Sequence, residues 1–471
     1  MGAHNVSIIL SIVITYVLLT VLLSLWTKKF TSTSARFMTG GRDMGAFVIG
    51  VLMMSEFIGT AATMGTAEAA FGKGISAAWN LVSMCLAFVL FACFMASKFQ
   101  RLGEYTISGA IATRYGEKVR LMTSVIMIYA LQVVNVSMYV GGAATIATIL
   151  HLPTYIATLI TAAVTILYVA VGGIKGVAYT NLIHASIKYF GLIITTVVAL
   201  QFSGGSLTHL REVMPPVYFS LTGVGLPTII AWTIGNIGAV FSTQYVIQAI
   251  AAIKDEHKAR KASWLAGLLM IPVGLMSAFI GVAAKYVFPQ IKGVSAIPTL
   301  AARMDPWFGG LVIAGLVAAV FGTVSASTLG STALVMKDFY VPLLKPSEKH
   351  TLIATRILSI VIGLLPVPFA MLMPGVLKTI FFARALRTSI AIVATCMFFA
   401  PGFSSGTGAF WGLLLAALGA SGWFFMGNPF GIDNIYVAAA IPLVVMMIDH
   451  VLKGAGSGPA VEQKTMGAGT Q

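Results

Sequence analysis

Residues 55–65 read SEFIGTAATMG and place glycines, small polar residues and an acid in the middle of an apolar run. Glycine permits a break in a helix. A break exposes backbone carbonyls and amides, which a membrane tolerates only where they line a site. Similar mixtures recur at Asn80, at residues 235–238 and at residues 322–332. Close helix packing through small residues is the alternative explanation for any one of these segments.

The composition indicates a membrane protein. The 471 residues are 58% hydrophobic and only 9% charged, whereas soluble proteins carry roughly 25% charged residues. The net charge of +15 does not indicate nucleic-acid binding, because the basic residues cluster in short loops between apolar runs. No nucleotide-binding GxxxxGK[ST], HExxH or GxSxG motif occurs, so we expect neither an enzyme nor an organic cofactor.

The apolar runs predict an all-α membrane protein. A span needs about 20 residues. We predict about thirteen transmembrane helices, near residues 7–26, 45–68, 75–97, 121–149, 154–173, 181–202, 225–250, 262–287, 307–336, 352–374, 377–400, 407–426 and 433–452. They form a single transmembrane transporter domain, 1–452, and the glycine-rich residues 453–471 are predicted to be a disordered cytoplasmic tail.

The loop charges predict the orientation. With the N-terminus outside, the cytoplasmic loops and the tail hold 19 Lys and Arg residues, and the opposite loops hold 6. Basic residues accumulate on the cytoplasmic side of membrane proteins. We therefore predict an N-terminus outside and a C-terminus inside, in the inner (plasma) membrane.

The spacing of the unusual spans favours a transporter. The second and seventh spans are five apart, and a repeat of five helices returns inverted in the membrane. Paired broken helices in inverted halves are typical of secondary transporters, and they predict repeats at about 45–202 and 225–400. A channel or a membrane-bound sensor is a distant alternative, but a channel usually shows oligomeric symmetry and a sensor needs a soluble signalling domain.

The ionisable residues within spans include Glu56, Glu68, Lys188, Arg384 and Arg387. Each would cost roughly 2.5–3.5 kcal/mol at the membrane centre, so each should face a cavity or a partner. One hypothesis pairs Glu68 with an arginine to close the outer side. Another has an arginine receive a substrate carboxylate. Lys188 could instead reach the membrane surface or hold a structural ion pair.

The ninth span is rich in hydroxyl groups, with six Ser or Thr residues between 323 and 332. A sodium ion needs several oxygen ligands, which a broken helix and neighbouring hydroxyls could supply. Thr323 and Ser327 are four residues apart and share a helix face. The alternative is that each hydroxyl bonds back to its own helix.

Six segments in order resemble the sodium:solute symporter family, which includes sodium/galactose and sodium/proline transporters. The resemblance covers about 450 residues. Its segments are FMTGGR at 37–42, the glycine frame at 65–74, RYG at 114–116, GGIKGVAYTN at 172–181, QY followed by KDE and AR within 244–260, and ST followed by KDFY within 331–340.

This resemblance implies a LeuT-type core of two inverted five-helix repeats, spans 2–6 and 7–11, with one helix before and two after. It also implies a co-transported sodium ion between spans 2 and 9. By position, the carbonyls of Ser55, Ile58 and Ala319 would bind it, and the two hydroxyl positions fall on Gly322 and Thr323.

Two residues depart from the family pattern. Gly322 replaces a serine, and Asn181 replaces an aspartate that many members use in or near the ion path. Thr323 with a water, or Ser325, could complete the sodium site. Glu56 beside the break could instead carry a proton, so proton-coupled symport is the alternative.

We expect the solute near the bilayer midplane, against the two breaks. The candidate contacts are Thr60, Asn80, Gln132, Asn135, Asn236, Thr243 and Gln244. A small organic acid or amino acid is favoured over a sugar, because few aromatic–carboxylate pairs line the core and two arginines lie in the eleventh span. The sequence thus predicts sodium-coupled symport of a small solute by alternating access. Its expected partners are the solute, sodium and the bilayer, with no nucleic acid or obligate protein partner.

Overall fold

A computed structural model describes residues 3–27, 44–169, 173–373 and 375–453, so the segment 37–42 and the predicted tail lie outside the described residues, apart from residue 453. Within the described ranges the regular elements are helical, without strands. The α-helices are α1 Ala3–Thr27, α3 Ala46–Phe57, α4 Thr66–Lys73, α5 Trp79–Leu90, α6 Ala96–Leu102, α7 Ile107–Tyr115, α8 Glu117–Leu150, α9 Thr154–Val169, α10 Gly173–Phe202, α11 Leu207–Val213, α12 Leu226–Ser242, α13 Gln244–Ala251, α14 Glu256–Leu268, α15 Met270–Val287, α16 Ala296–Arg303, α17 Pro306–Val335, α18 Val341–Leu344, α19 Glu348–Leu364, α20 Val367–Ala370, α21 Val376–Phe399, α22 Gly406–Phe425 and α23 Asn434–Lys453.

Short π- and 3-10 segments join or interrupt these helices. They are η2 Ala61–Gly65, η3 Ile75–Ala78, η4 Phe91–Met95, η5 Pro216–Phe219, η6 Gly293–Ser295, η7 Met336–Tyr340 and η8 Pro429–Gly431.

The described residues contain ten helical segments long and apolar enough to cross a membrane, and two bent helix pairs that raise the number to twelve. The apolar helix over α9 is shorter than a typical span. The chain is therefore a multi-pass helical membrane protein, and the count of thirteen stays a prediction.

The first bent pair confirms that the second span is broken at Gly59. α3 and the helix that continues as η2 and α4 meet at 59°, across residues 58–60. Ile58 leaves helical geometry at ψ 64°. A Cβ on residue 59 would lie 2.5 Å from the Met138 sulfur and 2.7 Å from the Thr323 hydroxyl. Glycine at this position thus lets the broken backbone approach two other helices.

The seventh span is also broken, but not at the glycines of residues 235–238. α12 and α13 meet at 44°, and the break is at Thr243, whose ψ is 129°. Gly235 and Gly238 lie inside the regular helix α12, where a Cβ on residue 238 would lie 2.6 Å from the Thr388 Cα atom. These glycines serve close helix packing, the alternative explanation, rather than a break.

The small-residue segments of the third and ninth spans are likewise unbroken. Asn80 lies within α5, and residues 322–332 lie within the continuous helix α17. Asp305 caps α17 by accepting a 3.0 Å hydrogen bond from the Trp307 amide, and Pro306 occupies its first position.

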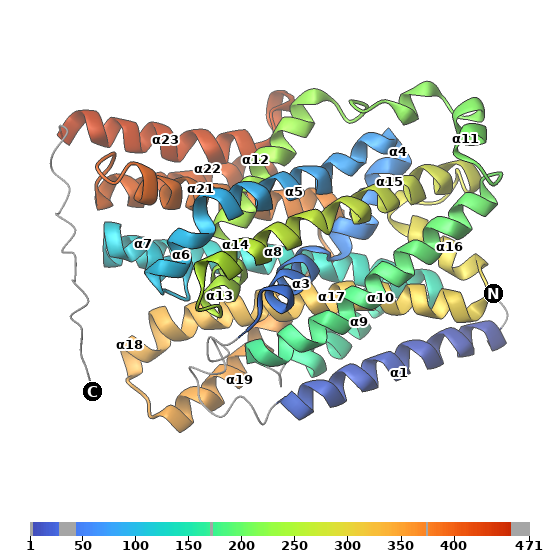
Figure 1. The fold of residues 1–471 in the computed structure, drawn as a ribbon, viewed down its shortest axis with the longest axis horizontal. Coiled ribbons are helices and arrows are strands. Elements are labelled where there is room, and N and C mark those ends of the chain that lie inside the picture. Colours follow the sequence, from blue (N-terminus) through green and yellow to red (C-terminus); the bar gives the residue numbers. More distant parts are fainter. Residues whose placement is uncertain (1–2, 28–43, 170–172, 374, 454–471) are drawn as a thin grey trace.

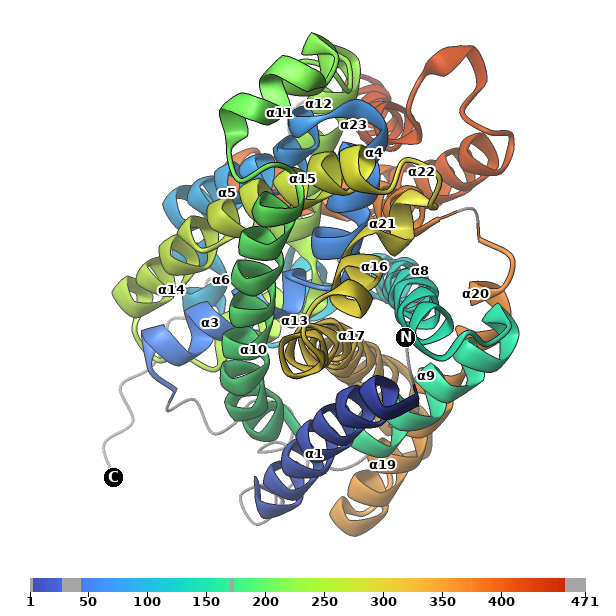
Figure 2. The same cartoon turned by 90° about the vertical axis from the view of Figure 1, so that its right-hand side faces the viewer.

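The long helices α8 and α17 pack against each other and run along the middle of the molecule (Figures 1 and 2). Each span of one repeat has a counterpart five places away in the other repeat. The helix pairs α10–α17, α3–α14 and α4–α15 therefore correspond to the pairs α21–α8, α12–α5 and α13–α6. All six pairs are in contact. This is the contact pattern expected of two five-helix repeats, whose bounds stay a prediction.

α1 begins and α23 ends at opposite ends of the long axis (Figure 1). α7 and α18, within the basic loops 98–120 and 337–351, lie at the end where α23 ends. The structure thus separates the ends as the predicted orientation requires. Which end faces the cytoplasm stays a prediction.

Candidate functional site

The break between α3 and η2 lies against α17, as predicted for spans 2 and 9. The Thr323 hydroxyl donates a 2.7 Å hydrogen bond to the Glu56 carbonyl. The six residues predicted for the sodium site are all buried: Ser55, Ile58, Ala319, Gly322, Thr323 and Ser325. Ser325 donates to the Gly322 carbonyl of its own helix at 3.0 Å. Thr323, rather than Ser325, therefore contacts the broken segment.

Lys188 of α10 occupies the oxygens of Ser55. Its ammonium donates to the Ser55 carbonyl at 2.7 Å and to the Ser55 hydroxyl at 3.0 Å. The Ser55 hydroxyl in turn donates to the Asn181 side-chain oxygen at 2.6 Å. Lys188 is only 2% exposed, so it does not reach the membrane surface. Because an ammonium already binds Ser55 and residue 322 has no hydroxyl, these groups do not fit a sodium ion in this arrangement.

Two arginines of α21 are buried close to the second break. Arg384 donates to the Asn80 side-chain oxygen at 2.8 Å, and its guanidinium lies 4.3 Å from the centre of the Phe381 ring. Arg387 donates to the Thr243 hydroxyl at 2.8 Å. Both are at most 2% exposed, and neither takes part in the ion pairs seen among the described residues. Within the part of the chain that the structure describes, these two buried positive charges have no carboxylate paired with them.

A small cavity brings both arginines to the break of the second span. The space within it that the centre of a water molecule can occupy is only about 10 Å³, enough for about one water. Glu56 is the acidic residue in its wall, so the charged groups facing this space carry a net positive charge when ionised. The cavity is lined by Glu56, Phe57, Gly59, Ala61, Val134, Met138, Tyr245, Thr323, Ile380, Arg384 and Arg387.

Three of the predicted solute contacts position these arginines. Asn80 accepts from Arg384, and its own amide donates to the Thr66 hydroxyl at 2.8 Å. Asn236 donates to the Asn80 carbonyl at 2.8 Å. Thr243 accepts from Arg387 and donates to the Ala239 carbonyl. The structure therefore places Asn80, Asn236 and Thr243 behind the guanidinium groups.

The other predicted solute contacts hold helices together outside the cavity wall. Thr60 donates to the Ser137 carbonyl at 3.3 Å. Gln132 donates to the Ser331 hydroxyl at 3.3 Å, and Asn135 donates to the Thr328 hydroxyl at 3.4 Å. The Gln244 side-chain oxygen accepts from the Ile107 amide, and its nitrogen donates to the Tyr105 carbonyl, both at 3.0 Å.

Glu68 and the arginines do not form the hypothesised outer pair in this structure. The arginines hydrogen-bond Asn80 and Thr243 instead. Glu68 lies on α4 beside Gly293, with its carboxylate facing Gly375 at the start of α21.

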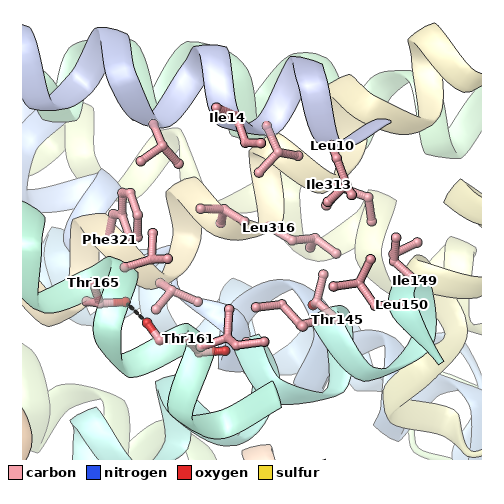
Figure 3. A pocket seen from close by; sticks show the side chains of 18 of the residues that line it. Leu10, Ile14, Thr145, Ile149, Leu150, Thr161, Thr165, Ile313, Leu316 and Phe321 are labelled. Atoms are coloured by element: carbon pink, nitrogen blue, oxygen red, sulfur yellow. Dashed lines mark hydrogen bonds between the residues drawn. The ribbon is translucent and has the colours of Figure 1, made fainter. Parts of the chain in front are cut away.

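A larger cavity lies between α1, α8, α9 and α17 and is almost entirely apolar (Figure 3). Its threonines bond to their own helices: Thr145 to Gly141, Thr161 to Ala157 and Thr165 to Thr161. Among the described residues that line this space, the polar side chains are these three threonines, so it offers a polar solute few partners.

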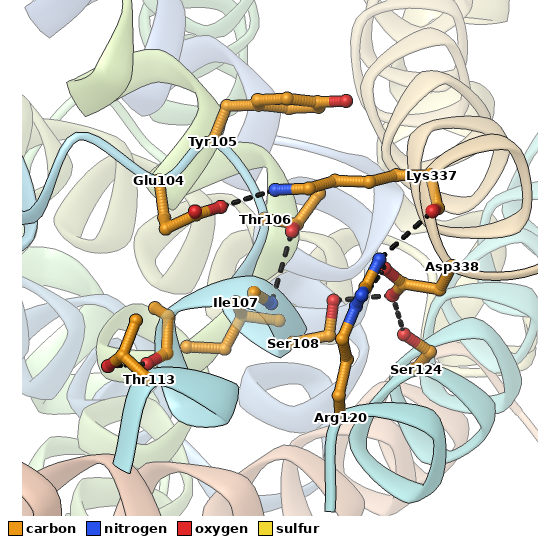
Figure 4. Close-up of polar contacts among 12 residues, drawn as sticks. Glu104, Tyr105, Thr106, Ile107, Ser108, Thr113, Arg120, Ser124, Lys337 and Asp338 are labelled. Atoms are coloured by element: carbon orange, nitrogen blue, oxygen red, sulfur yellow. Dashed lines mark hydrogen bonds and ion pairs between the residues drawn. The ribbon is translucent and has the colours of Figure 1, made fainter. Parts of the chain in front are cut away.

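Polar groups also close the end of the molecule where α8 begins and α17 ends (Figure 4). The Asp338 carboxylate is buried and pairs with Arg120 at 2.8 Å. It accepts from the Ser108 hydroxyl at 2.5 Å and from Ser124. This cluster joins α7, α8 and η7.

Lys337 extends the same cluster toward the connection between α6 and α7. It pairs with Glu104 and lies 4.3 Å from the centre of the Tyr105 ring. Burial, with Asp338 and Glu104 adding to it, raises the pKa of Tyr105 to about 12. The phenol therefore stays neutral at physiological pH.

Sequence reasoning did not assign three residues to these sites: Lys188, Tyr245 and Asp338. Lys188 lies seven residues after Asn181 on α10, which is two helical turns, and this spacing could have placed both beside one site. Asp338 stands in a basic loop and in the KDFY segment of the family resemblance, and neither pattern indicates a role at a site. Tyr245 follows the break at Thr243, which the sequence did not locate.

The sequence profile of the sodium:solute symporter family matches residues 37–416. A sodium/proline symporter of Haemophilus influenzae is 25% identical, over 84% of this chain and 84% of that protein. A sodium/proline symporter of Escherichia coli is 24% identical, over 73% and 72%. A sodium/glucose cotransporter of Vibrio parahaemolyticus is 24% identical, over 74% and 72%.

Solved structures share the fold. A Na⁺-coupled sialic acid symporter, in a substrate-bound outward-open state, superposes with a TM-score of 0.80 at 16% identity, over 95% of this chain and 98% of that one. Mhp1, a nucleobase-cation-symport-1 family transporter, gives a TM-score of 0.62 at 16% identity, over 88% and 94%. Both are helical transporters with the LeuT-type fold implied above.

Proposed function

Because the chain belongs to the sodium:solute symporter family, we propose that it is a secondary active symporter for a small solute that carries a carboxylate. It works by alternating access in the plasma membrane. One observation supports this class of solute. Arg384 and Arg387 are buried, face a small cavity and have no ion-pair partner among the described residues.

Buried charge explains the preference for an anionic group. A buried ion is unfavourable unless it is paired and hydrogen-bonded. Arg384 has the neutral side chain of Asn80 as a partner, and its Nε atom has none. Arg387 has the neutral side chains of Thr243 and Tyr245 and the Ala383 carbonyl. A carboxylate entering the cavity would accept from these donors and neutralise one of the two charges.

The position of the arginines suits alternating access. Arg387 contacts Thr243 at the break of α12 and α13, and the cavity also touches the break beside Gly59. A solute bound there would contact both broken helices at once, which is how binding can favour one arrangement of the two repeats over another.

The relatives support an amino acid as the first solute to test. Two of those reported are named for proline, which bears a carboxylate, and one for glucose, which does not. The sialic acid symporter of the same fold also has a carboxylate in its named solute. We place proline and small organic acids ahead of sugars.

The coupling ion has two candidates. Sodium comes first, because the family and the named relatives are sodium-coupled transporters. Coupling to a proton comes second, and one observation favours it: the Ser55 oxygens, predicted for sodium, bind the Lys188 ammonium.

Uptake into proteoliposomes tests the proposal. We expect concentrative uptake of proline or another small carboxylate when either a sodium gradient or a proton gradient is imposed, and competition by carboxylates but not by sugars. Uptake that merely equilibrates under both gradients, or that prefers glucose over every carboxylate tested, would contradict the proposed function.

A further inference from the structure

We infer that the Lys188 ammonium takes the place of a sodium ion between α3 and α17, so that this chain binds no sodium there. The inference takes its functional meaning from the proposed symporter. Its test needs no solute and can therefore fail or succeed separately from the proposed function.

The contacts of Lys188 are those of a bound cation. Its ammonium lies 2.7 Å from the carbonyl oxygen of Ser55, at the last regular turn before the break. Its second acceptor is the Ser55 hydroxyl at 3.0 Å. That hydroxyl donates its own proton to Asn181, so its lone pairs are free to face the ammonium. The Lys188 nitrogen is thereby fixed on oxygens of the broken segment.

The space for this ammonium comes from Gly322. A Cβ on residue 322 would lie 2.9 Å from the Lys188 nitrogen and 2.8 Å from the Asn181 side-chain oxygen. It would also lie 3.5 Å from the Ser55 hydroxyl. A serine at this position would therefore press on the Lys188 nitrogen and the Asn181 oxygen and lie in ordinary contact with the Ser55 hydroxyl. Its absence removes a hydroxyl ligand and admits the lysine.

The two departures from the family pattern thus meet at one point. Gly322 borders the ammonium, and Asn181 orients the serine hydroxyl that the ammonium binds. The sequence identifies both residues as departures without reference to Lys188. Because both lie at its ammonium group, they support a single change, in which the tethered lysine cation replaces a bound ion. A sodium ion in the same space would meet a like charge within a few ångströms in a buried site.

The replacement has a structural consequence. A cation between α3 and α17 bridges a broken helix to its neighbours, and here the bridge is covalently attached to α10. The contact between α3 and α10 is then independent of sodium concentration. Sodium that drives the proposed transport would act through oxygens elsewhere in the chain.

The experiment measures binding of radioactive sodium and thermal unfolding of the purified protein in sodium chloride against choline chloride. Thr323→Ala is the probe of the site, and Lys378→Ala, which removes an exposed lysine of α21, is the control. We expect Thr323→Ala to leave sodium binding unchanged, whether the wild type binds none or binds it elsewhere. A loss of tenfold or more in sodium affinity in Thr323→Ala, absent from the control, would overturn the inference.

A reconstructed site provides the converse test. The variant with Lys188→Ala, Gly322→Ser and Asn181→Asp should gain saturable sodium binding and a sodium-dependent rise in melting temperature, both lost when Thr323→Ala is added. A folded, monodisperse variant that gains no binding would also overturn the inference. Should that variant fail to fold, Lys188→Ala with Gly322→Ser, which keeps Asn181, is judged by the same gain, because it empties the space and restores the hydroxyl.

Discussion

At the residue scale, the buried cations Lys188, Arg384 and Arg387 fall into two groups with different surroundings. Lys188 is hydrogen-bonded to the carbonyl and the hydroxyl of Ser55 in the broken helix, so its ammonium is already occupied. Arg384 and Arg387 border a cavity, and their visible partners are neutral side chains. We therefore assign the lysine to structure and the arginines to the solute.

Arg387→Gln tests the arginine assignment. A hydrogen bond to a charged group contributes about 1.5–3 kcal/mol, so the KM for a carboxylate solute should rise roughly 10–100-fold. Initial uptake rates over a range of solute concentrations measure it. Arg356→Gln, on α19 away from the cavity, should leave the KM unchanged, and an equal rise in both variants would count against the assignment.

Gly322→Ser tests the contact with Lys188 by a double-mutant cycle. The added side chain should displace the ammonium from Ser55 and lower the free energy of unfolding by about 1–3 kcal/mol. On a Lys188→Met background the same change should cost much less, because no charged donor is displaced. Thermal or denaturant unfolding in detergent measures both; equal costs on the two backgrounds would contradict the contact.

At the element scale, helix breaks and helix packing use the same residue types in different ways. Gly59 stands at a break because its missing side chain admits Met138 and Thr323. Gly238 stands in a regular helix because its missing side chain admits the backbone of α21. Glycine content alone cannot distinguish these roles.

Gly238→Ala probes this packing between α12 and α21. Its Cβ would lie 2.6 Å from the Thr388 Cα atom, which cannot move aside as a flexible side chain can. Overpacking of this kind typically costs about 1–3 kcal/mol, so we expect a lower melting temperature. Gly422→Ala on α22, where a Cβ meets nothing within 4 Å, is the matched control and should unfold like the wild type.

The sequence predicted much of the helical framework for a physical reason. Long apolar runs must form helices in lipid, and the segment around Gly59 is broken where its composition suggested. The break at Thr243 was missed because it is fixed by tertiary contacts with Arg387 rather than by local glycine content.

The solute candidates showed the same limit: Asn80, Asn236 and Thr243 lie behind the arginines, and Thr60, Gln132, Asn135 and Gln244 tie helices together. Composition identifies buried polar groups, but only packing decides which of them face a cavity.

At the scale of the whole molecule, the proposed alternating access requires the two ends beyond the cavity to open in turn. The cluster around Asp338 joins α7, α8 and η7 at one end, and we propose that it holds this end closed (Figure 4). Removing one partner of a buried ion pair leaves an uncompensated buried charge and strongly destabilises the arrangement that holds it. A single change in this cluster should therefore shift the protein between its closed and open states.

Asp338→Asn should open that end. In a background without the native cysteines, Ser331→Cys on α17 should react at least about tenfold faster with a water-soluble thiol reagent when Asp338 is replaced. Asp305→Asn, which removes the cap at the opposite end of α17, is the control and should not change the rate. No acceleration in Asp338→Asn would show that this cluster does not close the end.

The most direct measurement compares, in proteoliposomes, the concentrative uptake of the best-carried amino or organic acid with that of its uncharged amide. It is made for the wild type and for Arg387→Gln. Our account predicts that the wild type accumulates the acid and discriminates strongly against the amide, and that Arg387→Gln loses most of this discrimination. Equal uptake of acid and amide by the wild type would contradict the claim that the buried arginines receive a carboxylate.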